Sequence, residues 1–207
     1  MVYLFGASGH AKVIIESLEL EHKMIGGLID VNPLLTRLSA YPVYQKLPNG
    51  FDVKKDGLIV SIGGNAIRKK VVNQLSAVFI TSIHPSSNLS KWTTIGEGTV
   101  IMAGVSVNAD CKIGKHVILN TNCSVDHDCV IGDFVHVSPN VALAGDVSVG
   151  EGTHIGIGAC VIQGIKIGKW ATIGAGATLI KDVPDFAVVV GNPGKIIKFN
   201  QPNDLNI

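Results

Sequence analysis

The chain has 207 residues, 46% of them hydrophobic and 16% charged, which is typical of a globular protein that buries a core. Seventeen Lys and Arg against sixteen Asp and Glu give a formal net charge of +1, which excludes a global field that recruits nucleic acid or an anionic membrane. No basic segment leads into a long apolar run at the start, and no window holds eighteen consecutive apolar residues. We therefore expect a soluble cytoplasmic protein whose partners bind at a local site.

Residues 1–82 predict an α/β domain. An apolar run over residues 2–5 enters the turn GASGH, and residues 11–21 carry apolar side chains at helical spacing. Two more apolar runs, 24–29 and 58–62, predict strands, and a basic helical stretch follows over 66–75. Because strands alternate with helices, the sheet should be parallel. The pattern changes near residue 82, just before His84-Pro85.

Every sixth residue from Ile83 onward is aliphatic, which predicts a left-handed parallel β-helix built from hexapeptide repeats. The positions are Ile83, Leu89, Ile95, Ile101, Val107, Ile113, Leu119, Val125, Ile131, Val137, Leu143, Val149, Ile155, Val161, Ile167, Ile173 and Leu179. Three six-residue sides make an eighteen-residue coil, so residues eighteen apart should stack in neighbouring coils. The repeat ends at Asp182-Val-Pro184, which gives a β-helix over 83–184 and a tail over 185–207.

The small residue that recurs four positions after each aliphatic residue should also point inward. Cys111, Cys123 and Cys129 occupy this position, and only Cys160 does not. We therefore expect the cysteines to be structural, with no disulfide, metal-binding or nucleophilic role.

Histidines on the repeat are the candidates for chemistry, because the repeat itself needs no imidazole. His136 and His154 are eighteen residues apart and should stack, whereas Gly145 lies eighteen after His127 and should leave space above that imidazole. His127 also stands between Asp126 and Asp128, and a carboxylate bonded to an imidazole raises its basicity. His127 is therefore the candidate general base; the alternative is a surface histidine between solvated carboxylates.

The GASGH turn places free backbone N–H groups at the start of a helix, where they bind phosphate well. Asp30, after the second predicted strand, is placed to accept hydrogen bonds from a ribose or uracil. The full G-x-G-x-x-G motif is absent, which favours a mononucleotide over NAD; a merely tight strand-to-helix turn is the alternative. The run Arg68-Lys-Lys70 predicts a solvated helix face.

Four segments, FGASGHAKV, LIVSIGGNAIRKKV, NTNCSVDHDCVIGDFVHVSPNVALAGDVSVG and VVVGNPGKII, together resemble the NeuD/PglD-like nucleotide-sugar acetyltransferases. This family includes UDP-4-amino-sugar N-acetyltransferases of bacillosamine synthesis and the so-called sialic acid O-acetyltransferases. The resemblance implies a Rossmann-like domain that holds the nucleotide sugar and a β-helix that forms homotrimers, with acetyl-CoA as co-substrate in the groove between neighbouring helices.

The resemblance also implies roles for individual residues. His127 resembles the catalytic base and Asp128 the acidic residue that assists it, although Asp126 stays an alternative partner. His136 resembles a residue near the acetyl thioester, with Gly145, Ile157 and Ala175 along the pantetheine. The residues that resemble nucleotide-sugar contacts are Ser8, Gly9, His10, Asp30 and Gly63.

The implied reaction needs alignment of the thioester with an amine, a base and donors for the oxyanion, and no metal. Three other hypotheses stay open. One is O-acetylation of a sugar or sialic acid. A second is a γ-carbonic-anhydrase-like metalloenzyme that uses His136 and His154 with a histidine of a neighbouring subunit. The third is a non-catalytic scaffold.

Overall fold

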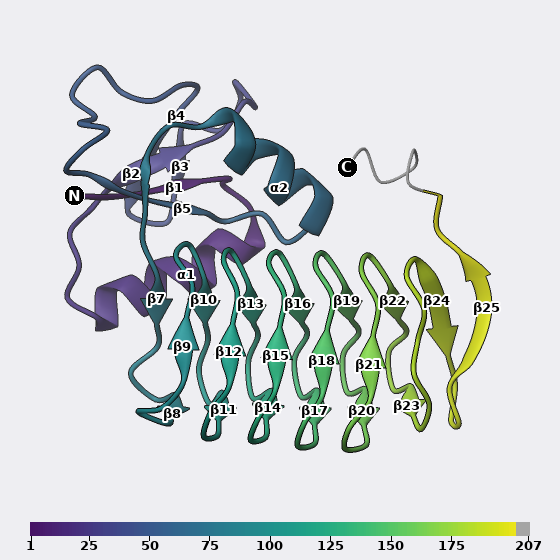
Figure 1. The fold of residues 1–207 in the computed structure, drawn as a ribbon. Helices are drawn as coiled ribbons and strands as arrows, with labels where there is room; N and C mark the ends of the chain where they lie inside the picture. The colour runs from purple at the N-terminus through teal and green to yellow at the C-terminus, as the bar shows by residue number, and fades with distance from the viewer. Residues whose placement is uncertain (202–207) are drawn as a thin grey trace.

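The computed structural model describes residues 1–201 and places an α/β domain against one side of a long parallel solenoid (Figure 1). The domain has one six-stranded sheet of order β3-β4-β2-β1-β5-β6, parallel except for β3. Its strands are β1 (Val2–Phe5), β2 (Ile25–Ile29), β3 (Arg37–Leu38), β4 (Tyr41–Tyr44), β5 (Gly57–Val60) and β6 (Val78–Phe79); its helices are α1 (Gly9–Leu20) and α2 (Asn65–Gln74).

The centre of this sheet is a topological switch point. The chain leaves β1 through α1 to reach β2 on one side, and leaves β5 through α2 to reach β6 on the other side. Since β1 and β5 are parallel neighbours, the turns that follow them emerge at the same edge of the sheet. Ligands of open α/β sheets bind at such a point.

The solenoid has three flat faces, which we number in chain order. Face 1 contains β7 (Ser82–Ile83), β10 (Val100–Ile101), β13 (Ile118–Leu119), β16 (His136–Val137), β19 (His154–Ile155) and β22 (Thr172–Ile173). Face 2 contains β8 (Asn88–Leu89), β11 (Ser106–Val107), β14 (Ser124–Val125), β17 (Ala142–Leu143), β20 (Cys160–Val161) and β23 (Thr178–Leu179). Face 3 contains β9 (Thr94–Ile95), β12 (Lys112–Ile113), β15 (Val130–Ile131), β18 (Ser148–Val149) and β21 (Lys166–Ile167).

The six-residue periodicity therefore predicts the β-helix correctly. Each aliphatic repeat position is the second residue of a strand, and strand partners differ by eighteen residues, as in His136 opposite His154. The inward aliphatic and small residues form one continuous core. Cys111, Cys123 and Cys129 are buried in it and Cys160 is exposed, as predicted, and all four are free thiols.

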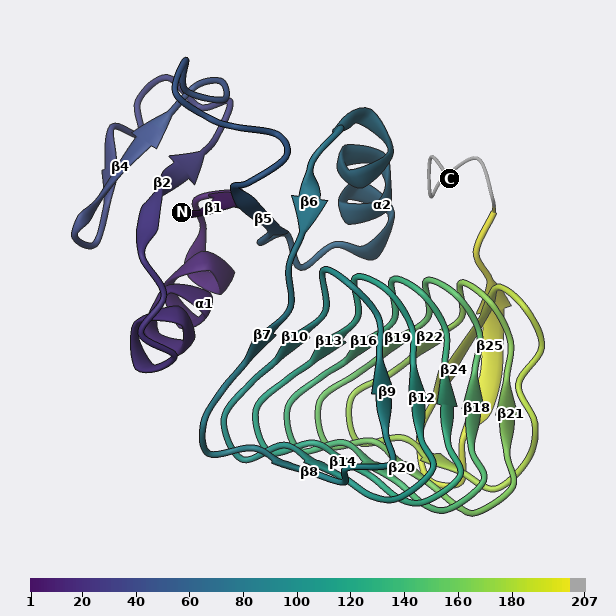
Figure 2. The ribbon, with the colours of Figure 1, turned by 60° about the vertical axis from the view of Figure 1, so that its left-hand side comes forward.

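The α/β domain packs on face 1 because this face carries apolar residues on its outer side. Val100 and Ile118 are almost fully buried and belong to the same hydrophobic cluster as Ile14 and Leu18 of α1. Helix α1 lies beside the first coils and α2 above the middle ones (Figures 1 and 2). Faces 2 and 3 stay uncovered by the domain.

The prediction of a solvated helix face at Arg68-Lys-Lys70 was wrong for Arg68. Lys70 is exposed, but Arg68 is only 1% exposed and lies between α2 and the solenoid. Helical periodicity could not reveal this, because α2 presents its arginine rather than an aliphatic side chain to its neighbour.

The segment after residue 184 continues the solenoid. Strand β24 (Ala187–Val190) pairs parallel with β22, and β25 (Lys195–Phe199) pairs antiparallel with β24. The part of the predicted tail that the structure describes thus adds two strands to the sheet of face 1; residues 202–207 lie outside the described part.

A matched pair of corner glycines tests how tightly the corners are packed. Gly98 and Gly164 have nearly equal φ angles, +70° and +73°, but a Cβ on Gly98 would overlap the imidazole of His116 while that of Gly164 meets nothing within 4 Å. His116 is buried, so it has no room to move away. We expect Gly98→Ala to lower the free energy of unfolding by roughly 1–3 kcal/mol more than Gly164→Ala, measured by urea denaturation. Equal losses would show that strain at positive φ, not packing, sets the cost.

Candidate active site

The GASGH turn follows β1 and leads directly into α1. Ser8 is the N-cap of α1, its side chain makes no capping hydrogen bond, and the first turn of α1 contains no acidic residue. The first backbone N–H groups of the helix therefore lack a side-chain partner. Ser8 and Gly9 are exposed, and a Cβ at Gly9 would meet nothing within 4 Å. The turn has room for an anion at the start of α1, and phosphate binding there stays a prediction.

Asp30 anchors this turn from the end of β2. Its Oδ2 accepts a hydrogen bond of 2.9 Å from the backbone N–H of Ala7, and its Oδ1 accepts one of 3.0 Å from Asn32. The carboxylate thus fixes the shape of the phosphate-sized turn. A contact between Asp30 and a nucleotide stays a prediction.

A pocket of about 610 Å³ lies between α2 and face 1. It is lined by Gly63, Gly64, Asn65, Ala66, Ile67, His136, Gly152, His154, Trp170, Ala171 and Thr172. The pocket thus brings together two residues predicted for different ligands, Gly63 and His136. A Cβ at Gly63 would meet nothing within 4 Å, so the backbone is open to a ligand there.

His136 and His154 stack as the eighteen-residue spacing predicts, with ring centroids 4.9 Å apart and an interplanar angle of 21°. His136 Nε2 lies 3.0 Å from Asn120 Nδ2, and His154 Nε2 lies 2.9 Å from Ser138 Oγ. Burial, followed by the charges of His154 and Arg68, lowers the pKa of His136 to about 3. Burial and Arg68 also lower the pKa of His154. Both rings are therefore neutral hydrogen-bonding groups at neutral pH.

No group of three His, Cys, Asp or Glu side chains within residues 1–201 is arranged to hold a metal ion. His10, the third histidine near this pocket, has a buried Nε2 without a hydrogen-bond partner. Burial and the charge of Arg68 lower its pKa to about 4. His10, the last residue of the GASGH turn, is therefore a neutral polar group whose Nε2 has no hydrogen-bond partner.

His127 lies at the corner between face 2 and face 3, just after β14. Its Nδ1 is 2.8 Å from Asp128 Oδ2, and 59% of its side chain is exposed. Asp128 reaches the ring because it adopts a left-handed backbone conformation with φ of 62°. The alternation of side chains along a strand does not apply here, since both residues lie beyond the strand. Nε2 has no hydrogen-bond partner in the described chain.

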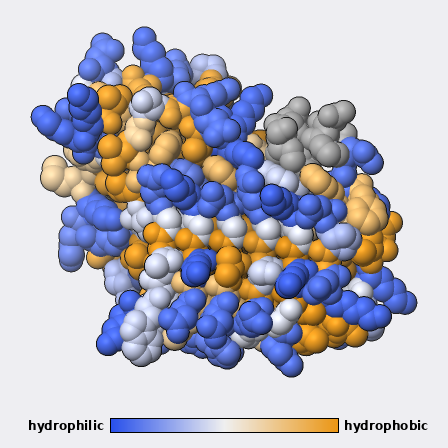
Figure 3. Space-filling model, in the orientation of Figure 1, coloured by the Kyte–Doolittle hydropathy of each residue, from blue (hydrophilic) through white to orange (hydrophobic). Residues whose placement is uncertain are grey.

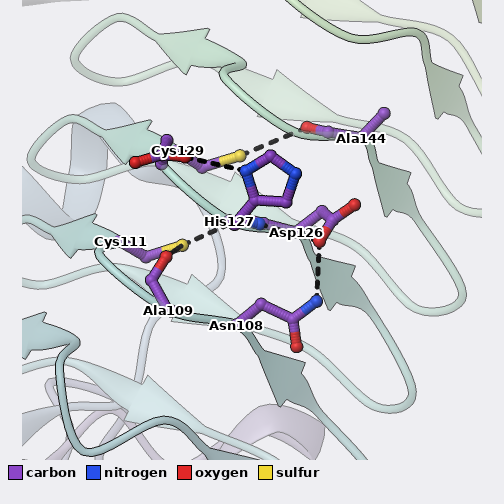
Figure 4. Close-up of polar contacts among 8 residues, drawn as sticks. Asn108, Ala109, Cys111, Asp126, His127, Cys129 and Ala144 are labelled. Atoms are coloured by element: carbon purple, nitrogen blue, oxygen red, sulfur yellow. Dashed lines mark hydrogen bonds and ion pairs between the residues drawn. The ribbon is translucent and has the colours of Figure 1, made fainter.

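Asp126 has a different role, which answers the question left open by the sequence. Its Oδ1 accepts hydrogen bonds from the backbone N–H of His127 at 2.8 Å and from Asn108 Nδ2 at 2.6 Å (Figure 4). Asp126 therefore holds the backbone of the corner. The hydrogen bond to Asp128 and the charge of Asp126 raise the pKa of His127; desolvation opposes them, and the charges of Asp128 and Asp146 raise the pKa further.

We expect Asp128→Asn to lower kcat/KM at neutral pH by roughly tenfold. A base works only while unprotonated, so activity falls as pH drops through the pKa of His127. Asp128 raises that pKa, and its replacement should therefore move the acidic limb of the pH–rate profile to lower pH. Any titrating group of the substrate is the same for both variants, so the difference between the two profiles reports the pKa of His127. An unmoved limb would contradict this role of Asp128.

Gly145 lies above His127 in the next coil, and the imidazole occupies the space that a side chain there would need. A Cβ at Gly145 would stand 2.6 Å from Cε1 and 2.7 Å from Nε2 of the ring. Gly145 therefore leaves room for the imidazole, as the spacing predicts, but the His127 ring fills this space and leaves no open gap for a ligand there.

Ile157 and Ala175 lie at another corner, between face 1 and face 2, and both are exposed. Between this corner and that of His127 stretches face 2, whose strands carry small outward residues: Ser106, Ser124, Ala142, Cys160 and Thr178. A groove of about 470 Å³ on this face is lined by Asp126, Ala142, Ala144, Cys160 and Ile162, among others. The sequence analysis did not single out this groove, although the run of small residues eighteen apart marks it.

The predicted residues form two groups that one chain keeps apart. The turn of residues 6–10, Gly63 and His136 gather at face 1, whereas His127 and Gly145 occupy the corner opposite that face, as the strand arrangement in Figure 1 shows. A side of six residues spans up to about 20 Å. His127 therefore does not reach a ligand bound at the pocket of its own chain.

An α/β domain with an open turn at its switch point, joined to a solenoid of hexapeptide repeats that carries an exposed histidine, is the architecture of the hexapeptide-repeat transferases. Residues 1–75 match the sequence profile of the PglD N-terminal domain, and residues 93–127 and 146–181 match that of the bacterial transferase hexapeptide (six repeats). The acetyltransferase domain of PglB from Neisseria gonorrhoeae is 34% identical, with a TM-score of 0.90 over 95% of this chain and 98% of that chain. The chain thus belongs to the NeuD/PglD-like acetyltransferase family.

The names of two further relatives state what those proteins bind or what reaction they catalyse. PerB from Caulobacter crescentus, solved in complex with CoA and GDP-perosamine, is 38% identical, with a TM-score of 0.87 over 95% of this chain and 97% of that chain. A UDP-N-acetylbacillosamine N-acetyltransferase of Bacillus subtilis is 48% identical over 48 residues, which is 22% of this chain and 22% of that relative. Within residues 1–201, no helix is long and apolar enough to cross a membrane.

Proposed function

We propose that this protein transfers the acetyl group of acetyl-CoA to the amino group of a nucleotide-linked 4-amino-sugar, in the synthesis of a bacterial surface glycan in the cytoplasm. The observation that carries the proposal is the exposed imidazole of His127, bonded through Nδ1 to Asp128 and free at Nε2. The open nucleotide turn at the switch point supports a nucleotide-linked acceptor. The relatives bound to CoA and GDP-perosamine support both substrates.

The chemistry follows from the state of His127. Its Nε2 accepts a proton from the sugar amine as the amine nitrogen attacks the thioester carbonyl. The tetrahedral intermediate then collapses, the carbon–sulfur bond breaks and the leaving CoA thiolate takes the proton from the His127 imidazolium, which restores the free base. Asp128 stabilises the imidazolium that forms in between. An amide and free CoA are the products.

The remaining residues divide between the two substrates. Ser8, Gly9, His10, Asp30 and Gly63 form or anchor the walls that would hold the nucleotide sugar. His136 would lie near the thioester, and Gly145, Ile157 and Ala175 would line the pantetheine. The exposure of Ile157 and Ala175 beside face 2, with its small side chains, supports a slender ligand along that face.

A homotrimer would bring the two groups together. Because His127 lies opposite the face that carries the nucleotide domain, its ligand must come from a neighbouring copy. The uncovered face 3 shows hydrophobic and weakly polar residues interrupted by hydrophilic ones (Figure 3). Its outward strand residues are Thr94, Lys112, Val130, Ser148 and Lys166, so copies that pack side by side here would have to pair or keep solvated two exposed lysines. Sedimentation equilibrium at micromolar concentration should give a trimer, and a monomer would contradict a shared site.

The test of the proposed function is a paired assay. Wild-type protein receives acetyl-CoA with a UDP-linked or GDP-linked 4-amino-sugar, or with the corresponding 4-hydroxy sugar, and CoA release is followed. We expect turnover of an amino sugar and little turnover of its hydroxy counterpart, since an amine is the better nucleophile. Turnover of the hydroxy sugars alone would make the protein an O-acetyltransferase, the alternative that the family also contains.

A further inference from the structure

Arg68 is the most deeply buried charged residue of the described chain. It lies in the first turn of α2 with 1% of its surface exposed. All its hydrogen bonds go to neutral oxygens, and no carboxylate within residues 1–201 pairs with it. The acceptors are the carbonyls of His116 (2.9 Å), Ile62 (2.9 Å), Gly63 (3.2 Å) and Phe134 (2.7 Å), and Oδ1 of Asn65 (2.9 Å).

If Arg68 served only to fill space, its burial would be energetically unfavourable. A buried cation without a counter-charge is unfavourable, and a cation in the first turn of a helix also opposes the helix dipole. Burial lowers the pKa of Arg68 to about 9. An aliphatic side chain would fill the same space without these costs. The five N–H donors of the guanidinium are therefore needed for the groups that they join by hydrogen bonds.

On one side, Arg68 connects to a column of corner carbonyls on the solenoid. His116 and Phe134 are eighteen residues apart, and the next member, Gly152, accepts a hydrogen bond of 3.0 Å from Nδ2 of Asn65. Phe134 and Gly152 each stand two residues before a pocket histidine, His136 and His154 respectively. The column therefore fixes the coil segments that carry the histidine pair.

On the other side, Arg68 holds the turn that follows β5. Its Nη1 donates to both Ile62 and Gly63, and this turn forms the opposite wall of the pocket. Gly63 itself has no side chain that would anchor the turn by packing, and the space beside it is open. The guanidinium is thus the link between the two walls.

We infer that Arg68 is a positioning residue for the nucleotide sugar. Its hydrogen bonds set the turn of residues 62–65 in register with the His136–His154 pair. This inference rests on the proposed function, because it takes the pocket between these walls as the acceptor site. A preset turn lowers the ordering cost of binding. Because Arg68 is buried, it has no surface with which to touch a ligand. Its charge also helps to lower the pKa of His136 and His154, which keeps both rings neutral.

The test compares Arg68→Met and Arg68→Lys with Lys70→Met, an exposed residue of the same helix. Methionine removes charge and donors, whereas lysine keeps the charge but loses the planar fork. We expect both Arg68 variants to raise KM for the nucleotide amino sugar by at least about tenfold, with KM for acetyl-CoA within about twofold of wild type. The drop in kcat should be smaller than the rise in KM, and Lys70→Met should behave as wild type.

Other outcomes would overturn the inference. Wild-type KM in Arg68→Lys would mean that charge alone matters, and equal increases in both KM values would mean general disruption. A lower melting temperature with unchanged KM values would leave Arg68 a structural residue only. If Arg68→Met does not fold, Arg68→Lys decides alone.

Failure of the proposed function can be separated from failure of this inference. Calorimetric binding of UDP, GDP and acetyl-CoA needs no turnover. Weaker diphosphate binding by Arg68→Lys, with unchanged acetyl-CoA binding, supports the positioning role even if the sugar or its acetylation is assigned wrongly. Absence of turnover by wild type in the paired assay overturns the proposed function alone.

Discussion

Replacing His127 with alanine is expected to lower kcat/KM for acetyl transfer by about 10²- to 10⁴-fold, the usual contribution of a positioned general base. The loss should appear mainly in kcat, because the imidazole acts on the proton that leaves the amine during attack. The fold should be unaffected, since 59% of the His127 side chain is exposed and it belongs to no part of the core.

The control is His22→Asn, which changes an exposed histidine at the end of α1, far from the proposed site. His22 has φ of 55°, a conformation that asparagine tolerates well. Circular dichroism and sedimentation should be the same for both variants and wild type. Near wild-type turnover in His127→Ala, with a verified substrate, would remove His127 from the mechanism.

A methyl group at Gly145 should cost about 10²-fold in kcat/KM, although it lies on a different coil from the base. The added Cβ would stand within 2.7 Å of His127 Nε2, closer than atoms approach. The ring is exposed and can turn aside, so the free energy of unfolding should change little. Turning aside breaks the 2.8 Å contact with Asp128 and misplaces Nε2.

The double variant Gly145→Ala/His127→Ala shows whether the effect passes through the imidazole. If it does, Gly145→Ala should have almost no further effect once His127 is gone. A further loss of similar size in the double variant would mean that Gly145 acts elsewhere, for example directly on bound acetyl-CoA.

The solenoid could be predicted in detail because its period is imposed by backbone geometry. Six residues per side leave one aliphatic and one small residue pointing inward, so burial, strand register and the stacking of His136 on His154 follow from counting. The gap at Gly145 followed from the same count. The order of strands and helices in residues 1–82 was also predictable, apart from the β3–β4 hairpin, where Pro42 argues against a strand.

The parts that escaped prediction depend on local backbone conformation or on tertiary contacts. Whether Asp126 or Asp128 bonds the ring depends on the positive φ of Asp128, which spacing does not encode. Arg68 looked like one of three solvated basic residues, because only the docked solenoid supplies the carbonyls that surround it. The roles assigned to the site residues stay predictions.

His127 lies far from the turn of residues 6–10 within one chain, and this separation links the local features of the proposed site. The residues proposed to hold the nucleotide sugar lie at face 1, and those around His127 lie at the opposite corner. Within one chain, neither group forms the whole proposed site. The proposed mechanism therefore requires several copies to assemble, and the uncovered faces of the solenoid are where that assembly would form.

The most direct measurement is a crystal structure of the protein with CoA and the nucleotide amino sugar that the paired assay selects. We predict that the sugar amine lies within about 2.6–3.2 Å of His127 Nε2 of a neighbouring copy, or one water away, with the diphosphate at the turn of residues 6–10. A bound sugar amine that no His127 of a neighbouring copy approaches, with every His127 facing solvent, would contradict it.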